Sequence, residues 1–265
     1  MPAINSSKIE ASGVYYNNGN YYIIFDNLHK IAIIKQDFSI INSNQWLGKE
    51  RAKRKSGFEG ITYNPLTNKY LVVQESEKFQ NKIIPVIHEF THDFETSDSY
   101  DIDFLLKNEN KGAEGITFFK IKNESYILLL FEKPNTLNQS TNEVGNILVL
   151  KKKNGYYEEF AYLSLPKNVN FDDFSDIAWN GSKIAVLSQE SSSLWVGELT
   201  EELTWKNAGN TYYFPKREGE YLYCNLEGIS WINETTIVLV SDTSKKKQPS
   251  ICKEKSEMIH LWKIK

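Results

Sequence analysis

Three short phrases of the sequence begin with the same Glu-Gly-Ile triplet, at Glu59, Glu114 and Glu227. Two related phrases have serine in the place of glutamate, at Ser12 and Ser175. Each of the five residues stands at the start of a short apolar run that is typical of a β-strand. Carboxylate and hydroxyl oxygens are the ligands that hard cations prefer, so these five residues could together form a metal site.

A second set of acidic residues lies where the next strand of each phrase should end. Together with the acid that follows Ser175, this set comprises Asp26, Glu75, Glu132, Asp176, Glu190 and Asp242. We expect these residues to hydrogen-bond the inner strands or the metal ligands and so to orient them. Carboxylates gathered this closely repel one another, and a bound cation would relieve the repulsion. Ca²⁺ is the expected ion, because it accepts six to eight oxygen ligands in a flexible geometry.

These residues can meet only if the segments that carry them are repeats of one structural unit. Successive units start at intervals of 47, 55, 61 and 52 residues, at Ser12, Glu59, Glu114, Ser175 and Glu227. Each contains an apolar strand, a turn, a second apolar strand and further strand candidates. A four-stranded propeller blade needs about 40–50 residues, so the pattern predicts an all-β, five-bladed β-propeller that occupies residues 1–265 as a single domain. A six-bladed ring is the alternative, and a β-sandwich would lack the repeat.

The fifth unit is one strand short, because only Met258–Lys265 follows its first two strands. We expect the residues before Ser12 to supply the missing strand, so that the two ends of the chain pair and close the ring without an exposed edge. Cys224 and Cys252 are too few and too far apart for a zinc site. We expect free thiols, with one disulfide as the alternative.

In a propeller the first strand of each blade lines the central channel, and the second runs antiparallel beside it. Both sets of oxygen-bearing residues are therefore expected at one mouth of the channel. The alternative is that the Glu-Gly pairs only form strand-start turns, with carboxylates that are solvated or that accept backbone N–H groups of the neighbouring blade.

The composition of the chain limits its classes of partner. The 265 residues carry 31 basic and 34 acidic side chains, and this net charge of −3 argues against a nucleic-acid partner, which requires a basic surface. No apolar run approaches about 18 residues, so no membrane span is expected. The first residues lack the pattern of a signal peptide, which leaves a cytoplasmic protein or an exported mature chain as expectations. The sequence leaves the oligomeric state open.

Basic residues precede three of the strand starts, on loops that should overhang the same mouth. Lys55, Lys111 and Arg217 are the candidates for binding an anion there. A cation that polarises a phosphoryl oxygen, basic groups that screen the remaining charge and a carboxylate-activated water would together hydrolyse a phosphate ester. The catalytic residues in this scheme are Glu59, Glu114 and Glu227. The alternative is a solvated set of surface lysines, which is also our interpretation of Lys151–Lys153 and Lys245–Lys247.

His88-Glu89-Phe90-Thr91-His92 matches the H-E-x-x-H pattern of zinc proteases. That site requires a helix, which places both histidines on one face, whereas residues 82–87 read as the third strand of the second blade. On a strand the two histidines would be about 13 Å apart at roughly 3.3 Å per residue, too far to share one metal ion. The sequence therefore disfavours a zinc site here.

The phrases GFEGITYNPLTNKYLVVQES and NLEGISWINETTIVLVSD resemble the β-propellers grouped as SdiA-regulated and phytase-like proteins, which repeat Glu-Gly at strand starts and an acid at the end of the next strand. The order Ser, Glu, Glu, Ser, Glu resembles the metal ring of the five-bladed calcium-activated nucleotidases, or apyrases, and DFSDIAWNGSKIAVLSQES is similar to their fourth-blade phrase. This resemblance implies an exported chain with one axial Ca²⁺, bound by Ser12, Glu59, Glu114, Ser175 and Glu227. The chain departs from the apyrase pattern at Asp26, which is followed by Asn27 in the place of arginine.

Three functions remain open at this point. The first is a calcium-dependent phosphohydrolase of the phytase or apyrase type, which would act on a phosphorylated small molecule at the channel mouth. The second is a non-catalytic propeller in which Ca²⁺ pins the blades while the mouth binds a ligand or a protein. The third is lactonase or esterase chemistry at the same ion. The fold alone does not choose among them, and the basic residues favour the first.

Overall fold

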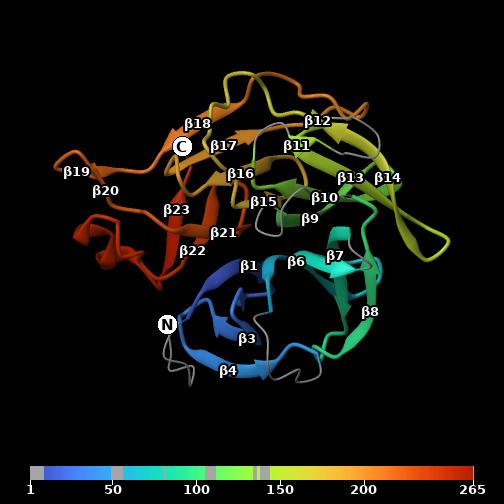
Figure 1. Ribbon diagram of the computed structural model, residues 1–265, viewed down its shortest axis with the longest axis horizontal. Coiled ribbons are helices and arrows are strands. Elements are labelled where there is room, and N and C mark those ends of the chain that lie inside the picture. The colour runs from blue at the N-terminus through green and yellow to red at the C-terminus, as the bar shows by residue number, and fades with distance from the viewer. Residues whose placement is uncertain are drawn as a thin grey trace.

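The computed structural model describes residues 9–48, 56–79, 82–104, 112–133, 136–137 and 144–264. Within these ranges the protein is almost entirely β, and the one helix is the short 3₁₀ helix η1 (Ser250–Lys255). No helix in these ranges is long and apolar enough to cross a membrane. Figure 1 shows the strands grouped in sheets around a central axis.

Four blades are antiparallel sheets of four strands each. The first blade consists of β1 (Ala11–Asn17), β2 (Asn20–Phe25), β3 (Leu28–Lys35) and β4 (Ile40–Trp46). The second blade consists of β5 (Phe58–Asn64), β6 (Lys69–Phe79), β7 (Lys82–Phe90) and β8 (Thr96–Asp101). The third blade consists of β9 (Ala113–Ile121), β10 (Glu124–Phe131), β13 (Ile147–Lys153) and β14 (Tyr156–Leu163). The fourth blade consists of β15 (Asp176–Trp179), β16 (Ile184–Ser188), β17 (Ser193–Gly197) and β18 (Asn210–Tyr213).

The fifth blade has three strands in the described part of the chain. These are β21 (Leu226–Trp231), β22 (Thr236–Ser241) and β23 (Ile259–Lys263). The predicted fourth strand belongs to the residues before Ser12, and residues 1–8 lie outside the described ranges. Two small hairpins form separate two-stranded sheets and consist of β11 (Thr136–Leu137), β12 (Val144–Gly145), β19 (Lys216–Arg217) and β20 (Glu220–Tyr221).

The inner strands form a closed ring. Each packs against the inner strands of both neighbouring blades, in the order β1, β5, β9, β15 and β21, and β21 packs back against β1. The ring therefore closes after five blades, which confirms the predicted five-bladed β-propeller and excludes the six-bladed alternative. β1 and β2 are joined by Asn18 and Gly19, both with positive φ, as a two-residue hairpin turn requires.

The apolar core is divided into five clusters, one at each interface between neighbouring blades. β10 explains the continuous apolar runs of the sequence, because successive side chains of a strand point to opposite faces. Its Ile127 and Leu129 pack in the cluster between the second and third blades. Its Leu128 and Leu130 pack in the cluster between the third and fourth blades. A middle strand buried on both faces has no polar side.

The Glu-Gly-Ile-Thr/Ser phrase follows from the packing of adjacent inner strands. A Cβ atom on Gly60 would lie 2.7 Å from the backbone nitrogen of Ile116 in the next blade, so only glycine fits. The hydroxyl of Thr62 accepts the backbone N–H of Phe118 at 3.0 Å. Ser230 likewise accepts the N–H of Tyr16 at 3.0 Å, and this bond links the fifth blade to the first. The glycine and the Thr/Ser of the phrase therefore hold the ring together, and the glutamate remains for another role.

His88 and Glu89 lie on β7, whereas His92 lies in the turn that follows the strand. The H-E-x-x-H match is therefore not on a helix, as predicted, although the strand ends before the second histidine. Glu89 is fully buried and forms ion pairs with Lys69 at 2.8 Å and with Lys152 at 2.5 Å. It also accepts a hydrogen bond from the hydroxyl of Tyr157 at 2.8 Å. Because Lys152 and Tyr157 belong to the third blade, this cluster joins two blades. The interpretation of Lys151–Lys153 as a purely solvated loop is therefore wrong for Lys152.

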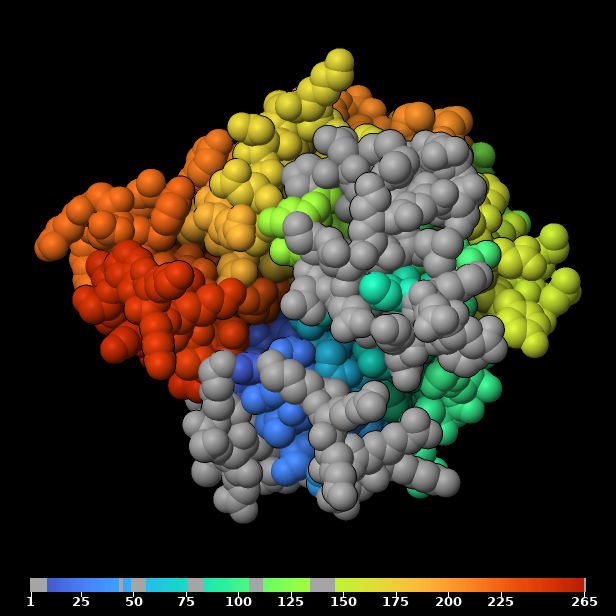
Figure 2. Space-filling model, in the orientation of Figure 1, coloured from blue at the N-terminus to red at the C-terminus, as the bar shows by residue number. Residues whose placement is uncertain are grey.

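Cys224 and Cys252 form a disulfide, which corrects the expectation of free thiols. The bond joins the residue before Asn225 to η1, two segments that the chain brings together only after folding. Figure 2 shows the β19–β20 hairpin in orange and the η1 region in red projecting together from one side of the molecule. The disulfide lies where these two segments meet the fifth blade.

Candidate functional site

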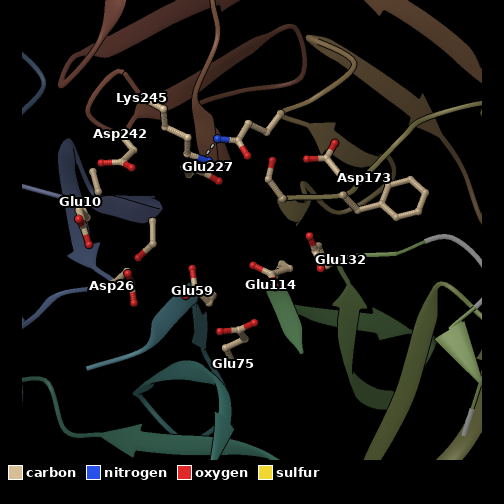
Figure 3. A pocket seen from close by; sticks show the side chains of 15 residues that line it. Glu10, Asp26, Glu59, Glu75, Glu114, Glu132, Asp173, Glu227, Asp242 and Lys245 are labelled. Atoms are coloured by element: carbon tan, nitrogen blue, oxygen red, sulfur yellow. Dashed lines mark hydrogen bonds between the residues drawn. The ribbon is translucent and has the colours of Figure 1, made fainter. Parts of the chain in front are cut away.

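A cavity of about 340 Å³ lies where the five inner strands begin (Figure 3). Its walls contain residues from all five blades, and carboxylates predominate among them. The lining residues are Glu10, Ala11, Ser12, Asp26, Glu59, Glu75, Glu114, Glu132, Asp173, Phe174, Ser175, Gln189, Glu227, Asp242 and Lys245.

All five residues predicted as the metal ring line this cavity, namely Ser12, Glu59, Glu114, Ser175 and Glu227. The backbone explains why they point inward. In four blades the pairing with the second strand shifts register across the ring residue, as it does between Phe58 and Gly60 on either side of Glu59. Such a β-bulge turns one side chain away from the alternation of the strand. The repeat therefore places one oxygen-bearing side chain per blade in the cavity.

The two serines of the ring also connect neighbouring blades. The hydroxyl of Ser12 donates a hydrogen bond to the carbonyl of Phe58, at the start of the second blade. The hydroxyl of Ser175 donates to the carbonyl of Leu226, at the start of the fifth blade, at 3.0 Å. Each hydroxyl hydrogen is therefore used by the fold, while lone pairs on the same oxygen remain available to a ligand.

Four acids of the second strands also line the cavity, namely Asp26, Glu75, Glu132 and Asp242. Asp26, Glu132 and Asp242 directly follow the ends of their strands, as predicted. Glu75 instead lies within β6, which continues to Phe79, at a point where its pairing with β7 shifts register. The fourth blade differs from the prediction. β16 ends at Ser188, so the equivalent position is held by Gln189, which lines the cavity, and not by Glu190. The side chain of Glu190 is 56% exposed and lies 3.8 Å from Lys133. The predicted place of Glu190 is therefore corrected by one residue.

Asp176 takes a different position from the other predicted acids. Its carboxylate accepts the backbone N–H of Ile177 at 2.7 Å and that of Ile229 in the fifth blade at 2.8 Å. The side chain is buried between the two inner strands and does not line the cavity. Burial raises the pKa of Asp176 well above its ordinary value, against the effect of these two hydrogen bonds. Asp176 thus orients inner strands, as expected for this set.

Sequence reasoning missed four polar residues that line the cavity, namely Glu10, Asp173, Gln189 and Lys245. A signal for the first two was present. Glu10 and Asp173 stand two residues before Ser12 and Ser175, the ring positions that lack a carboxylate. In the other three blades the equivalent residues are Gly57, Gly112 and Asn225. Each blade therefore supplies an acid either at the ring position or two residues before it.

The carboxylates of the cavity have strongly perturbed pKa values. The pKa values of Glu59 and Glu114 are raised well above that of an ordinary glutamate, first by burial and then by neighbouring carboxylates. Burial raises the pKa of Glu227 to about 8, although the charge of Lys245 acts in the opposite direction. Burial also raises the pKa of Glu75 to about 7. The cavity therefore holds protons near neutral pH that an exposed set of acids would release.

The donor set fits a hard cation in its chemistry, because carboxylate and hydroxyl oxygens surround the cavity. One oxygen, Oε2 of Glu132, is buried and has no hydrogen-bond partner in the described part of the protein. The side chains stand apart, however. Among the described residues, no three His, Cys, Asp or Glu side chains are close enough together to form a metal cluster. A bound ion would require some of these side chains to rotate inward.

The predicted anion-binding residues do not meet at the cavity in the described ranges. Lys55 and Lys111 lie outside those ranges. Arg217 lies on β19 and pairs with Glu254 at 2.5 Å, and it does not line the cavity. Lys245 is exposed, as we expected of residues 245–247, and it is also the cationic residue among the described lining residues (Figure 3).

Comparisons with known proteins show the fold alone. Neither the family models nor the curated proteins gave a match to this chain. Among solved structures, the PQQ-bound aldose sugar dehydrogenase of Streptomyces coelicolor has a TM-score of 0.53 and 11% sequence identity, over 96% of this chain and 95% of that one. A protein of unknown function from Bacteroides caccae has a TM-score of 0.49 and 12% identity, over 89% and 72%. A gluconolactonase from Xanthomonas campestris has a TM-score of 0.45 and 10% identity, over 89% and 71%.

Proposed function

We propose that this protein is a calcium-binding β-propeller and that Glu59, Glu114 and Glu227, with Ser12 and Ser175, hold the ion in the central cavity. The observation that carries the proposal is the placement of one oxygen-bearing side chain at the equivalent position of every blade, all facing one cavity. A ring that only formed strand-start turns would not need its glutamates to face one another, and their mutual repulsion is costly.

The raised pKa values of the ring glutamates support a cation at this position. Burial and neighbouring acids disfavour the ionised forms of Glu59 and Glu114. A divalent ion favours the ionised forms, so its binding would release protons from the cavity. The long side chains of the ring glutamates can rotate toward a common point. The ring serines and the acids of the second strands would supply the remaining oxygens.

We further propose that the cavity hydrolyses a phosphorylated small molecule, as phytases and apyrases do. When bound, Ca²⁺ would polarise a phosphoryl oxygen and offset part of the phosphate charge. With the ion bound, the ionised carboxylate of Glu227 would accept a proton from an attacking water as the bond between phosphorus and the leaving-group oxygen breaks. Glu59 and Glu114 would orient that water from the neighbouring blades. The substrate would enter from the open side of the cavity.

The test is a comparison of Glu114→Gln with Glu190→Gln. Calorimetric titration measures Ca²⁺ affinity, and a phosphate-release screen over nucleotides, sugar phosphates and phytate measures activity. We expect Glu114→Gln to lower Ca²⁺ affinity by at least tenfold and to abolish phosphate release, because it removes a charged ligand. Glu190→Gln removes the same charge on the next blade but outside the cavity, so it should behave as wild type. Wild-type protein that binds no Ca²⁺ at millimolar concentration would overturn the proposal.

A non-catalytic propeller is the second candidate, and one observation favours it. The ring serines donate to the backbone carbonyls of Phe58 and Leu226, so part of the ring already acts as a link between blades. In this case Ca²⁺ would pin the blades and the mouth would bind its ligand without hydrolysis. Ca²⁺ binding without phosphate release from any compound of the screen would favour this candidate.

A further inference from the structure

We propose that Lys245 recognises the anionic group of the ligand and that a strap, residues 243–257, holds it at the cavity under the control of the Cys224–Cys252 disulfide. The inference deepens the proposed function and rests on it. It assigns to Lys245 the oxyanion contact that the sequence had suggested for Lys55, Lys111 and Arg217. The strap is the segment between β22 and β23, and it contains η1.

The position of Lys245 suits an anion contact. Its side chain lines the cavity and extends toward Glu227 (Figure 3). Yet its ammonium group has no carboxylate within ion-pair distance among the described residues, in contrast to Lys133, which lies 3.5 Å from Glu132. A lysine at the edge of an acidic cavity that forms no close ion pair can donate to an incoming oxyanion.

Hydrogen bonds fix the backbone of Lys245, and its side chain is exposed. Its N–H donates to the side-chain oxygen of Gln248 at 2.7 Å, and the N–H of Gln248 donates to the carbonyl of Lys245 at 3.0 Å. The side-chain amide of Gln248 donates to Asn225 at 2.5 Å. Asn225 in turn donates to the carbonyl of Thr243 at 2.7 Å. The first turn of the strap is therefore tied at both ends to the residue before β21.

The same amide chain reaches the metal ring. The side-chain nitrogen of Gln189 donates to Asn225 at 3.1 Å and to the carboxylate of Glu227 at 2.5 Å. A chain of side-chain hydrogen bonds thus connects the turn that carries Lys245 with a proposed calcium ligand. It runs from Gln248 through Asn225 and Gln189 to Glu227. Any displacement of the strap would disturb both ends of this chain.

The disulfide fixes the far part of the strap. Cys252, in η1, is 2% exposed, and its partner Cys224 directly precedes Asn225. Without the bond, η1 would lose its covalent attachment to the base of the fifth blade, and the strap would gain conformational freedom. The ammonium of Lys245 would then be less well placed, because the entropy of ordering the strap would count against ligand binding.

Inorganic phosphate is the probe for this inference, titrated calorimetrically at saturating Ca²⁺. We expect Lys245→Met to weaken phosphate binding about tenfold or more, since a charge-assisted contact is lost. Lys247→Met, an exposed lysine of the same turn that does not line the cavity, is the matched control and should bind as wild type. Ca²⁺ affinity measured without phosphate should be unchanged or higher in Lys245→Met, because a repelling charge near the ion has been removed.

The disulfide is tested on the same titration. We expect Cys252→Ser to weaken phosphate binding several-fold. Gln248→Ala, which keeps the disulfide but cuts the amide chain, should weaken it in the same direction, and it serves if Cys252→Ser fails to fold. Two results would overturn the inference in protein that still binds Ca²⁺. One is equal phosphate affinity in wild type and Lys245→Met, and the other is an equal loss of phosphate affinity in Lys245→Met and Lys247→Met. Wild type that binds no Ca²⁺ would overturn the proposed function, and the inference with it.

Discussion

Among single residues, the lining of the cavity shows that each blade contributes a carboxylate from one of two positions near the start of its inner strand. Where the ring position carries serine, as in the first and fourth blades, Glu10 or Asp173 supplies the carboxylate from two residues upstream. A serine at the ring position is therefore not a lost ligand. It frees a hydroxyl to bond the neighbouring blade, while the acid remains close to the same cavity.

Gly60 offers a test of the packing that makes the ring possible. We expect Gly60→Ala to lower the free energy of unfolding by about 3 kcal/mol, because the new Cβ would meet the backbone of the next blade 2.7 Å away. Gly155→Ala is the control, since that Cβ would meet open space and costs only about 1 kcal/mol for its positive φ. Urea unfolding measures both variants. Equal losses would show that contact between inner strands does not explain the glycine.

The three ring glutamates could be predicted from sequence, because the Glu-Gly-Ile-Thr/Ser phrase repeats in three blades, and the two ring serines stand at the matching point of the repeat. The acids at the second-strand ends were harder to assign. In the fourth blade, Gln189 and Glu190 are adjacent, and the choice between them depends on β16 ending at Ser188. A shift of one residue in a strand reverses the face that a side chain occupies, and no repeat pattern fixes that end.

At the scale of the elements, Glu89 shows how two blades are joined away from the axis. It is buried on β7, and Lys152 reaches it from β13 of the next blade. Burial alone would raise its pKa, but the bonds from Lys152, Lys69 and Tyr157 prevail and lower the pKa of Glu89. A folded-state pKa below the unfolded value stabilises the protein above the unfolded pKa, and this contribution is lost as pH falls.

We expect Glu89→Gln to destabilise the protein by about 3 kcal/mol at pH 7, because it leaves two lysines facing a neutral buried group. Glu158→Gln serves as the control. Glu158 is 52% exposed and lies 3.9 Å from Lys153, so its loss should change stability by less than about 0.5 kcal/mol. Urea unfolding at pH 7 and at pH 4 measures both. The difference between the variants should shrink at pH 4, and a constant difference would contradict the assigned charge state of Glu89.

The elements that sequence reasoning misjudged are those placed by contacts far apart in the chain. The strap brings Lys245 to the cavity only because Asn225 and Cys224 hold it, and neither partner is adjacent in sequence. Arg217 lies on the β19–β20 hairpin, and its side chain forms an ion pair with Glu254 of η1. The hydrophobic pattern and the repeats predict the strands well, since both recur along the chain in every blade. They do not describe how two irregular segments meet.

At the scale of the whole molecule, the propeller concentrates charge on its axis and apolar contacts between its blades. Five apolar clusters hold neighbouring blades together. The first two strands of the blades, with the residues next to them, are thereby forced to bring nine carboxylates to one cavity, counted among the described lining residues. The packing of the blades therefore works against the repulsion at the centre. The balance between the two must depend on pH and on any cation that occupies the cavity.

The sign of the pH dependence follows from Glu75 and Glu227, whose pKa values are raised from 4.5 to about 7 and about 8. An acid with a raised pKa in the folded state binds its proton more tightly there than in the unfolded chain. Its contribution to stability is therefore fully present below pH 4.5 and is lost as pH rises through 7 and 8. In EDTA, we expect the Tm to fall between pH 5 and pH 9 by roughly 5–10 °C.

Added Ca²⁺ should reverse this trend, because it stabilises the ionised carboxylates by binding only to the folded state. We expect 1 mM Ca²⁺, taken as about 100 times Kd, to raise the Tm by roughly 5–10 °C at pH 8 and by much less at pH 5, where protons compete for the same oxygens. Calorimetric scans with Ca²⁺, with Mg²⁺ and with EDTA at both pH values measure the change in Tm. The control is Glu190→Gln, which should show the same rise in Tm with Ca²⁺ as wild type. A Ca²⁺ shift of equal size at pH 5 and pH 8 would place the ion away from the raised carboxylates, since only binding at those groups must displace their protons.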